Sequence, residues 1–467
     1  MNIIFDALQS GLKFASENIL SIAMMILLII GGLFLSIKTG FLQFRRFGYT
    51  MKNTVGTLFN KNLHIKDSGS VTPFQAVTTA LAGTIGTGSI AGLATALVSG
   101  GPGAVFWMWV SALLGMVTKY SEIVLSIKYR EKNESGIWAG GPMYYIKNGL
   151  GLKWLAAMFA IFAMIACIGT GNATQSNSIA VVFESSLDVA PWITGAILTL
   201  IVGVVILGGI KRIASVNEKF VPVMAVFFII AAMLALVFKA SSIPAALKLI
   251  FEEAFNFKAA FGGVAGYGIL SAMKYGVGRG VFSNEAGLGS APIAHAASSA
   301  KEPVKQGLWG AFEVFITTIV ICTMSALVVL TSDVYLGAFN AGVSPEVNGA
   351  ALSAAAFGQA LPYFGSVVIS ISTIFFALST ILGWAYYGEV CATYLFKSHQ
   401  KSAVLVYRLV YIAFVFIGAV AEIEIVWLIA DCFNALMALP NLIALTVLSK
   451  VVVDATKKHF ENKLDIK

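Results

Sequence analysis

Two glycine-rich strings contain the residues whose types and spacing could do chemistry in this chain. Residues 82–89 (AGTIGTGS) hold three glycines within six positions, and residues 275–290 (YGVGRGVFSNEAGLGS) mix glycines with charged and polar side chains. A glycine inside a helix costs about 1 kcal/mol relative to alanine, so both strings predict an interrupted helix. The N–H and C=O groups freed at an interruption can hold an ion or both ends of a zwitterion.

The composition indicates the environment of these strings. Of the 467 residues, 58% are hydrophobic and 12% are charged, and the mean hydropathy is +0.85. In soluble domains about a quarter of the residues are charged. The apolar residues form runs of about twenty, the length with which an α-helix crosses about 30 Å of hydrocarbon. The chain is therefore predicted to be an all-α integral membrane protein.

Eleven apolar runs predict about eleven transmembrane helices. They cover residues 19–36, 72–98, 103–127, 154–183, 190–210, 219–239, 260–297, 307–331, 364–396, 403–420 and 424–449. The leader before the first run has no basic n-region and no small-residue cleavage site, so we expect a retained helix and not a signal peptide. The two glycine-rich strings fall in the second and seventh runs.

Basic residues alternate between the predicted loops. The segment after the first run and the loops near residues 128–147 and 211–219 are basic, whereas residues 331–365 contain no lysine or arginine. The positive-inside rule then places the N-terminus outside and the C-terminal tail in the cytoplasm of a cell whose plasma membrane holds the protein. Orientation and contact with the lipid bilayer explain the net charge of +8, so no nucleic-acid partner is expected.

Enzyme, pump and channel functions find little support. The four cysteines lie in or at the ends of apolar runs, the four histidines are scattered, and no nucleotide-binding P-loop occurs. A channel would need a symmetric pore, which two unlike interruptions in one chain fit poorly. We therefore expect a carrier without enzyme activity.

The spacing of the interruptions favours an inverted repeat. If the first helix is peripheral, they lie in the first and sixth of ten core helices, which predicts two sets of five helices with ligands bound between them. The predicted units are residues 1–66 (peripheral helix and cytoplasmic loop), 67–240 and 241–449 (the two repeats) and 450–467 (cytoplasmic tail). Close helix packing is the alternative explanation of the glycines.

Four strings resemble the alanine/glycine:cation symporter family: GPGA at residues 101–104, GPMY at 141–144, GGIK at 208–211 and GVFSNEAGLGSAP at 280–292. The resemblance extends over nearly the whole chain. It implies a leucine-transporter-like fold with one extra N-terminal helix, and sodium-coupled symport of alanine and glycine by alternating access. A proton-coupled or glutamine-preferring symporter of the same fold is the alternative.

The resemblance also implies a sodium site. In this fold the carbonyls of Ala82 and Ile85 would face the eighth core helix, which offers the carbonyl of Phe376 and the hydroxyls of Ser379 and Thr380. These five residues are the predicted sodium ligands. Alternatively, the two hydroxyls bond back to carbonyls of their own helix.

A small neutral amino acid, the predicted substrate, needs donors for its carboxylate and acceptors for its ammonium group. The carboxylate donors are predicted to be the N–H groups of Gly86, Thr87, Gly88 and Ser89. Carbonyls around Met273 and Gly276 would accept from the ammonium group.

Five side chains near the interruptions have two explanations each. Gln175 is predicted to contact the substrate or to form an interhelical hydrogen bond, and Trp384 to cover a small substrate side chain or simply to pack. Lys274, Arg279 and Glu285 would form an internal ion pair, or Lys274 would titrate and carry a coupled proton.

Overall fold

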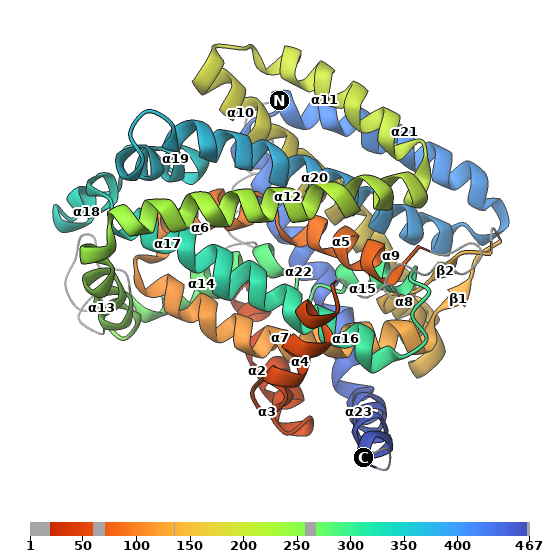
Figure 1. The fold of residues 1–467 in the computed structure, drawn as a ribbon. Helices are drawn as coiled ribbons and strands as arrows, with labels where there is room; N and C mark the ends of the chain where they lie inside the picture. Colours follow the sequence, from red (N-terminus) through yellow and green to blue (C-terminus); the bar gives the residue numbers. More distant parts are fainter. Residues whose placement is uncertain (1–18, 59–70, 135, 257–267, 465–467) are drawn as a thin grey trace.

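The computed structural model describes residues 19–58, 71–134, 136–256 and 268–464, and these are almost entirely helical (Figure 1). The one sheet in the described residues is a hairpin of β1 (Glu131–Lys132) and β2 (Trp138–Ala139), in which Glu131 pairs with Ala139. The predicted leader and residues 59–66 of the predicted cytoplasmic loop lie outside the described residues.

Twenty-two α-helices are described in chain order. Their bounds are α2 Ser21–Lys38, α3 Leu42–Arg45, α4 Phe47–Asn53, α5 Pro73–Thr84, α6 Ala91–Gly100, α7 Gly103–Tyr129, α8 Pro142–Tyr145, α9 Lys153–Ile168, α10 Thr174–Leu187, α11 Pro191–Ile206, α12 Gly209–Phe238, α13 Ile243–Ala254, α14 Ile269–Asn284, α15 Ala291–Ala296, α16 Pro303–Val314, α17 Thr323–Leu330, α18 Asp333–Asn340, α19 Gly349–Ala360, α20 Gly365–Leu395, α21 Gln400–Val420, α22 Ile423–Val447 and α23 Ser449–Leu464. Wider π-helical turns at Gly169–Ala173 and Phe315–Cys322 join α9 to α10 and α16 to α17.

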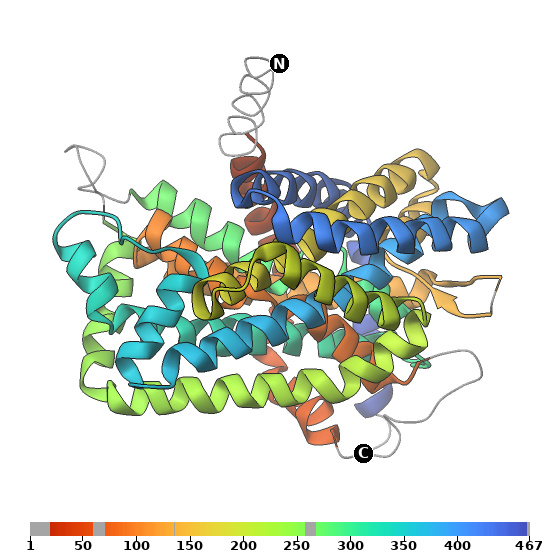
Figure 2. The same cartoon turned by 90° about the horizontal axis from the view of Figure 1, so that it is seen from above.

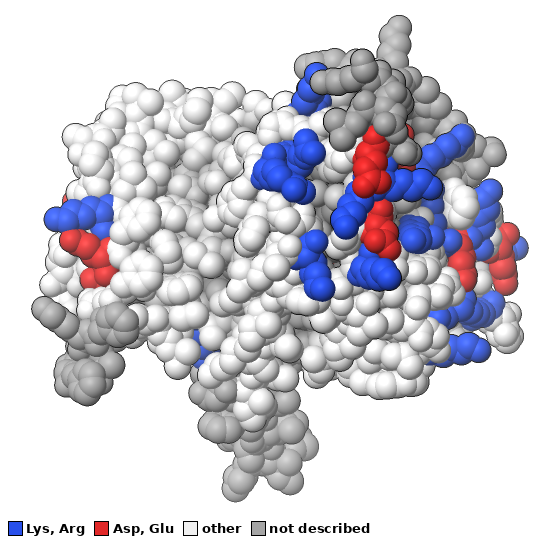
Figure 3. All heavy atoms as spheres, turned by 90° about the horizontal axis from the view of Figure 1, so that it is seen from below, with Lys and Arg blue, Asp and Glu red and all other residues white. Residues whose placement is uncertain are grey.

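Eight helical stretches in the described residues are long and apolar enough to cross a membrane. They are Ser21–Lys38, Gly103–Tyr129, Lys153–Glu184, Gly209–Phe238, Pro303–Leu330, Gly365–Leu395, Lys397–Val420 and Val426–Val447. Figure 3 shows a broad band almost free of charged side chains, with most of the lysines and arginines gathered at one end. The prediction of a multi-pass, all-α membrane protein is confirmed. The number eleven stays a prediction, because α11 and the two interrupted helices are shorter than a full crossing.

The order of the helices matches one peripheral helix followed by two sets of five. The first set is α5 with α6, α7, α9 with α10, α11, and α12; the second is α14 with α15, α16 with α17, α20, α21, and α22. Each set begins with an interrupted helix, as predicted. The peripheral α2 packs against α7 and α22. The exact limits of the four predicted units stay predictions.

The long helix α12 extends further than its hydropathy predicts. It begins at Gly209 and not near residue 219, and it runs along one edge of the molecule beside α20 (Figure 2). The extra turns contain Lys211, Arg212 and Glu218, which lower hydropathy but are good helix formers. Phe228 of α12 and Phe376 of α20 pack with 5.4 Å between their ring centroids. This contact fixes the part of α20 that carries the predicted sodium ligands.

Candidate ion and substrate site

The helix before the first interruption, α5, has a well-defined start and end. The side chain of Thr72 accepts from the N–H of Gln75 at 3.0 Å and the side chain of Gln75 accepts from the N–H of Thr72 at 3.1 Å, a capping box that starts α5. The helix ends at Thr84, Gly86 is extended (φ −110°, ψ −168°), and α6 resumes at Ala91. Between them Thr87–Ser89 form a short 3-10 turn, in which the carbonyls of Gly86 and Thr87 accept from the N–H groups of Ser89 and Ile90 at 3.1 Å each.

The structure brings four of the five predicted sodium ligands together. The Thr380 hydroxyl donates to the carbonyls of Ala82 and Phe376 at 2.9 Å each, and the Ser379 hydroxyl lies 2.9 Å from the Phe376 carbonyl and 3.5 Å from that of Ala82. All four residues are buried. Ile85 directly follows α5, so its carbonyl lies at the open end of that helix. The predicted alternative, in which the two hydroxyls bond back to a carbonyl of their own helix, is also present, because both bond to Phe376.

This oxygen cluster suits a hard cation such as sodium, the predicted cargo. Carbonyl and hydroxyl oxygens are hard ligands, and each hydroxyl can turn to present a lone pair. Among the described residues, no three His, Cys, Asp or Glu side chains form a group that could hold a metal ion. The chemistry of the donors therefore fits an alkali cation better than a transition metal.

Glycine at position 86 lets α20 approach the interruption. A Cβ on Gly86 would lie 2.6 Å from the Thr380 hydroxyl oxygen and 3.6 Å from Oε1 of Gln175. Such a contact is too short, so any larger residue would push α20 away from α5. The predicted ion and substrate residues therefore share one dry, tightly packed region.

The predicted carboxylate donors have protein partners on two sides. The hydroxyl and N–H of Thr87 donate to Oε1 of Gln175 at 2.9 and 3.4 Å. The hydroxyl of Ser89 lies 2.8 Å from that of Ser283 on α14. A Cβ on Gly88 would lie 2.9 Å from the ring of Phe282, so the two interrupted helices touch here. Gln175 is thus a direct neighbour of the predicted substrate donors.

The second interruption lies later than the sequence predicted. Residues 269–284 form the continuous helix α14, so Met273 and Gly276 lie inside a regular helix and not beside a break. Carbonyls within a helix are bonded to N–H groups four residues on, so these two are poor ammonium acceptors. A Cβ on Gly276 would lie 2.3 Å from the Ala104 carbonyl, which indicates a packing role against α7. The prediction for these two residues was misplaced.

The true interruption covers residues 285–290 and has its own supports. Glu285, Gly287 and Gly289 adopt positive φ angles of 58°, 93° and 80°. Oε1 of Glu122 accepts from the N–H of Gly287 at 3.0 Å, and the Asn441 amide donates to Glu122 at 2.6 Å and to the Gly287 carbonyl at 2.9 Å. Irregular backbone at membrane depth needs such partners. Neither Glu122 nor Asn441 was predicted from the sequence to support this interruption.

Glu285 links the two interruptions through Trp384. The indole N–H of Trp384 donates to Oε1 of Glu285 at 2.7 Å and lies 3.4 Å from the Gly83 carbonyl. The hydroxyl of Ser290 donates to the other oxygen of Glu285 at 2.5 Å. Trp384 is therefore tied to the backbone of α5 and to the second interruption, and its predicted role as a cover over the substrate stays a prediction.

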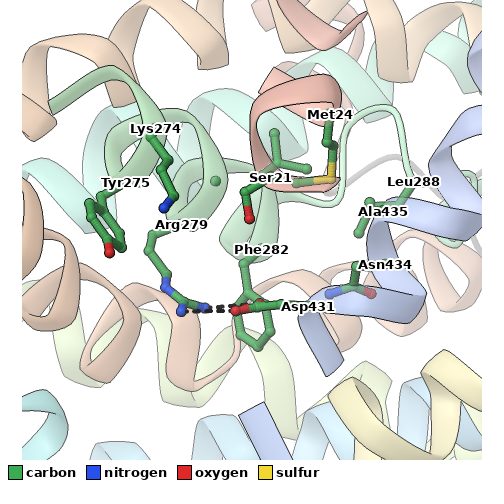
Figure 4. A pocket seen from close by; sticks show the side chains of 12 residues that line it. Ser21, Met24, Lys274, Tyr275, Arg279, Phe282, Leu288, Asp431, Asn434 and Ala435 are labelled. Carbon is green, nitrogen blue, oxygen red and sulfur yellow. Dashed lines mark hydrogen bonds and ion pairs between the residues drawn. The ribbon is translucent and has the colours of Figure 1, made fainter. Parts of the chain in front are cut away.

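The predicted internal ion pair among Lys274, Arg279 and Glu285 was wrong. Arg279 forms two hydrogen bonds with the carboxylate of Asp431 on α22, at 3.2 and 3.1 Å. Figure 4 shows this pair beside Phe282 at a cavity of about 90 Å³, with Lys274 on the same helix as Arg279. The ammonium group of Lys274 lies 5.1 Å from the centre of the Tyr275 ring. The guanidinium of Arg279 also lies 5.8 Å from the centre of the ring of Phe282, the side chain that packs against Gly88.

A second buried polar network supports the short helix α15. Nζ of Lys119 lies 3.0 Å from the Glu313 carboxylate and donates to the Asn284 carbonyl at 3.0 Å. His295 lies 2.8 Å from Glu313 and 2.8 Å from the amide of Gln306. Charged residues in the middle of apolar runs, here Lys119 and Glu313, were the available sequence signal for this network.

Backbone carbonyls at the end of α15 and just after it accept hydrogen bonds from Val71 and Arg130. The N–H of Val71 donates to the Ala297 carbonyl at 3.3 Å, next to the start of α5. The guanidinium of Arg130 donates to the carbonyls of Ala296, Ser298 and Ala300 at 3.0, 2.7 and 2.6 Å. Burial lowers the pKa of Arg130 to about 10, which leaves it charged at neutral pH. These hydrogen bonds hold the end of α15 against the start of α5 and the end of α7.

Taken together, two interrupted helices, an oxygen cluster between α5 and α20, and polar supports for each break define a transporter of the leucine-transporter fold. The structure of MhsT in complex with L-phenylalanine shares this fold, with a TM-score of 0.57 over 84% of this chain and 99% of that chain at 12% identity.

The chain belongs to the sodium:alanine symporter family, whose profile matches residues 5–466. The sodium/alanine symporter AgcS of Methanococcus maripaludis is 46% identical over 442 residues, which cover 94% of each chain. The probable sodium/glutamine symporter GlnT of Bacillus subtilis is 37% identical over 449 residues, covering 96% of this chain and 90% of that protein. The predicted family is confirmed, and the protein is a membrane transporter and not an enzyme.

Proposed function

We propose that this protein carries small neutral amino acids, alanine and glycine, into the cell together with sodium. The observation that carries the proposal is the position of the Ser379 and Thr380 hydroxyls, within 3.5 and 2.9 Å of the Ala82 carbonyl at the end of α5. A sodium ion bound between these oxygens would tie α5 in the first repeat to α20 in the second. Its binding energy would thus favour one arrangement of the two repeats.

The substrate would bind beside the ion, with its carboxylate at the N–H groups of residues 86–89, where it would replace the acceptors that Thr87 and Ser89 now have in Gln175 and the Gly86 carbonyl. The last turn of α14 reaches this position, because Phe282 and Ser283 contact Gly88 and Ser89. Carbonyls at a helix C-terminus lack partners in the helix and attract cations. The ammonium group would therefore bind at the end of α14, in place of the predicted Met273 and Gly276.

The pathway would run from the cavity at Arg279 and Asp431 inward. We propose that this cavity faces the outside of the plasma membrane, with the N-terminus outside and the C-terminal tail in the cytoplasm. The basic loops at the opposite end support this orientation through the positive-inside rule. The ion pair between Arg279 and Asp431 would form over a bound substrate and break to let the substrate enter or leave. On the inner side, the backbone contact between Val71 and Ser299 would block the pathway.

Glutamine is the second candidate substrate. The similarity to a probable sodium/glutamine symporter favours it. The buried amides and hydroxyls near the site, Gln175 and Thr87 among them, could also bind a substrate amide. Proton coupling through Lys274 is the alternative to sodium coupling, because this lysine lines the cavity.

The test is uptake into proteoliposomes that contain the purified protein. Labelled alanine, glycine and glutamine would each be offered with a sodium gradient at constant pH, and separately with a pH gradient without sodium. We expect saturable uptake of alanine and glycine with sodium alone. Uptake that is driven by protons alone and abolished in Lys274→Ala would show proton coupling instead of sodium coupling. Faster uptake of glutamine than of alanine or glycine would show that glutamine is the preferred substrate.

A further inference from the structure

Two neighbouring cavities follow one face of the peripheral helix α2. The first, of about 340 Å³, lies between α2 and α22 and is almost entirely apolar; its walls include Leu27, Ile30, Phe34, Leu439, Ile443 and Val447. The second, of about 370 Å³, lies where α2 ends, against the end of α3 and against α23. Its walls include Lys38, Arg45, Arg46, Lys457, Phe460 and Glu461.

The two cavities follow one another along the same stripe of α2, and we call the two together the groove along α2. Leu27, Ile30, Phe34, Ile37 and Lys38 recur at intervals that place side chains on one helix face. With a rise of about 1.5 Å per residue, Leu27 and Lys38 lie about 16 Å apart along the helix. One leaflet contributes about 15 Å of hydrocarbon, half of the bilayer core. The groove as a whole, from Leu27 to Lys38, therefore matches the depth of one leaflet.

The charged end of the groove is built for an anion. Four cationic side chains line it against the single carboxylate of Glu461. Within the described residues, Nε of Arg46 is buried without a hydrogen-bond partner, and its guanidinium lies 4.5 Å from the centre of the Phe460 ring. Arg45 donates a long hydrogen bond, of 3.4 Å, to the Thr39 carbonyl. Guanidinium groups in such positions are suited to a phosphate, which they bind with two parallel hydrogen bonds.

Exposed apolar side chains near the charged cavity indicate that it lies at the membrane interface. Ile37, Phe41 and Phe44 are 59%, 43% and 57% exposed. Exposed apolar side chains beside lysine and arginine are typical of the boundary between hydrocarbon and lipid headgroups. A soluble anion would not need this apolar surface or the apolar groove above it.

We propose that the groove along α2 binds an anionic glycerophospholipid, with its phosphate at Arg45 and Arg46 and an acyl chain between α2 and α22. The lipid would join the peripheral helix to α22 and α23, and so hold α2 against the transport core. This site is separate from the proposed ion and substrate site. Its occupant is recognised by a negative phosphate attached to a long apolar chain.

Native mass spectrometry of the purified, delipidated full-length protein tests the proposal. Phosphatidylglycerol and the zwitterionic phosphatidylcholine would be titrated separately, and we expect phosphatidylglycerol to bind about tenfold more tightly or better. In Arg45→Gln/Arg46→Gln this preference should disappear. The matched control, Lys211→Gln/Lys401→Gln, removes two exposed lysines outside the groove and should keep the preference.

A second variant tests the apolar half of the groove. Gly31 faces Leu442, and a Cβ there would meet it at an ordinary 3.7 Å, so Gly31→Leu fills the groove without touching the cations. This variant should weaken phosphatidylglycerol binding about tenfold. Equal binding of both lipids by the unmodified protein would overturn the proposal. Equally tight binding of soluble glycerol phosphate would also overturn it, because the site would then recognise the phosphate alone. A protein dimer whose interface covers the groove would overturn it as well.

Discussion

The indole N–H of Trp384 donates to the carboxylate of Glu285 at 2.7 Å, and this contact joins α20 to the first residue of the second interruption. Trp384 also lies 3.4 Å from the Gly83 carbonyl on α5. One side chain thus contacts both interrupted helices, next to the hydroxyls proposed to bind sodium. Rearrangement at the ion site would be transmitted to the second interruption through α20.

The two hydroxyls on α20 provide the most direct test of ion binding. In Ser379→Ala/Thr380→Ala, two of the proposed oxygen ligands disappear, and each is worth about 1 kcal/mol or more in a buried site. We expect the sodium concentration for half-maximal uptake to rise at least about tenfold. The control is Thr393→Ala, because Thr393 also bonds back to a carbonyl of α20 but lies away from the interruption. Unchanged sodium dependence in the double variant would remove these residues from the site.

Replacement of Trp384 tests how the substrate side chain is limited in size. Trp384→Ala should enlarge the pocket, weaken alanine uptake and admit competitors such as leucine or methionine. The relative uptake should change by about tenfold to a few hundredfold, since one methylene is worth only about 1–3 kcal/mol.

Trp384→Phe separates volume from hydrogen bonding in that experiment. It keeps a ring but loses the N–H that binds Glu285. If Trp384 limits substrate size, the phenylalanine variant should still exclude large amino acids. A Trp384→Ala protein that transports alanine normally and rejects every larger competitor would assign Trp384 to packing alone.

Glu122 is predicted to hold the second interruption in shape. Glu122→Ala would leave the N–H of Gly287 and the amide of Asn441 without their acceptor in a buried position. Each unsatisfied group costs about 1–3 kcal/mol. Thermal unfolding of the purified protein should therefore occur at a clearly lower temperature. Glu253→Gln, a change on α13, is the control, and equal melting temperatures for all three proteins would contradict the assignment.

Two glycines on α14 distinguish packing from ligand binding. Gly276→Ala would bring a Cβ to 2.3 Å from the Ala104 carbonyl, whereas a Cβ on Gly278 meets nothing within 4 Å. We expect Gly276→Ala to destabilise the protein by about 1–3 kcal/mol. Gly278→Ala should stabilise it slightly, by less than about 1 kcal/mol. A Gly276→Ala protein of normal stability with weakened substrate affinity would restore Gly276 to the substrate site.

The sequence alone determined the membrane-spanning class, the interrupted second run and the family. These features depend on local properties: the length of apolar runs, and the low helix propensity of three glycines between residues 83 and 88. With the family resemblance, the sequence also predicts that Ala82, Phe376, Ser379 and Thr380 lie close together, as they do in the structure, while sodium binding by them stays a prediction. Each of these features could be predicted either from the residues of a single helix or from the string at residues 280–292 that resembles the family.

The tertiary structure decided where the second helix breaks and how the charged residues pair. Gly276 and Gly280 have low helix propensity, yet both remain helical because α14 packs its glycines closely against α7. Arg279 finds its partner Asp431 152 residues later in the chain. Local propensity describes only a residue and its near neighbours along the chain. The partner of a buried charge depends instead on which distant helix is packed beside it, because a buried charge needs a partner at contact distance.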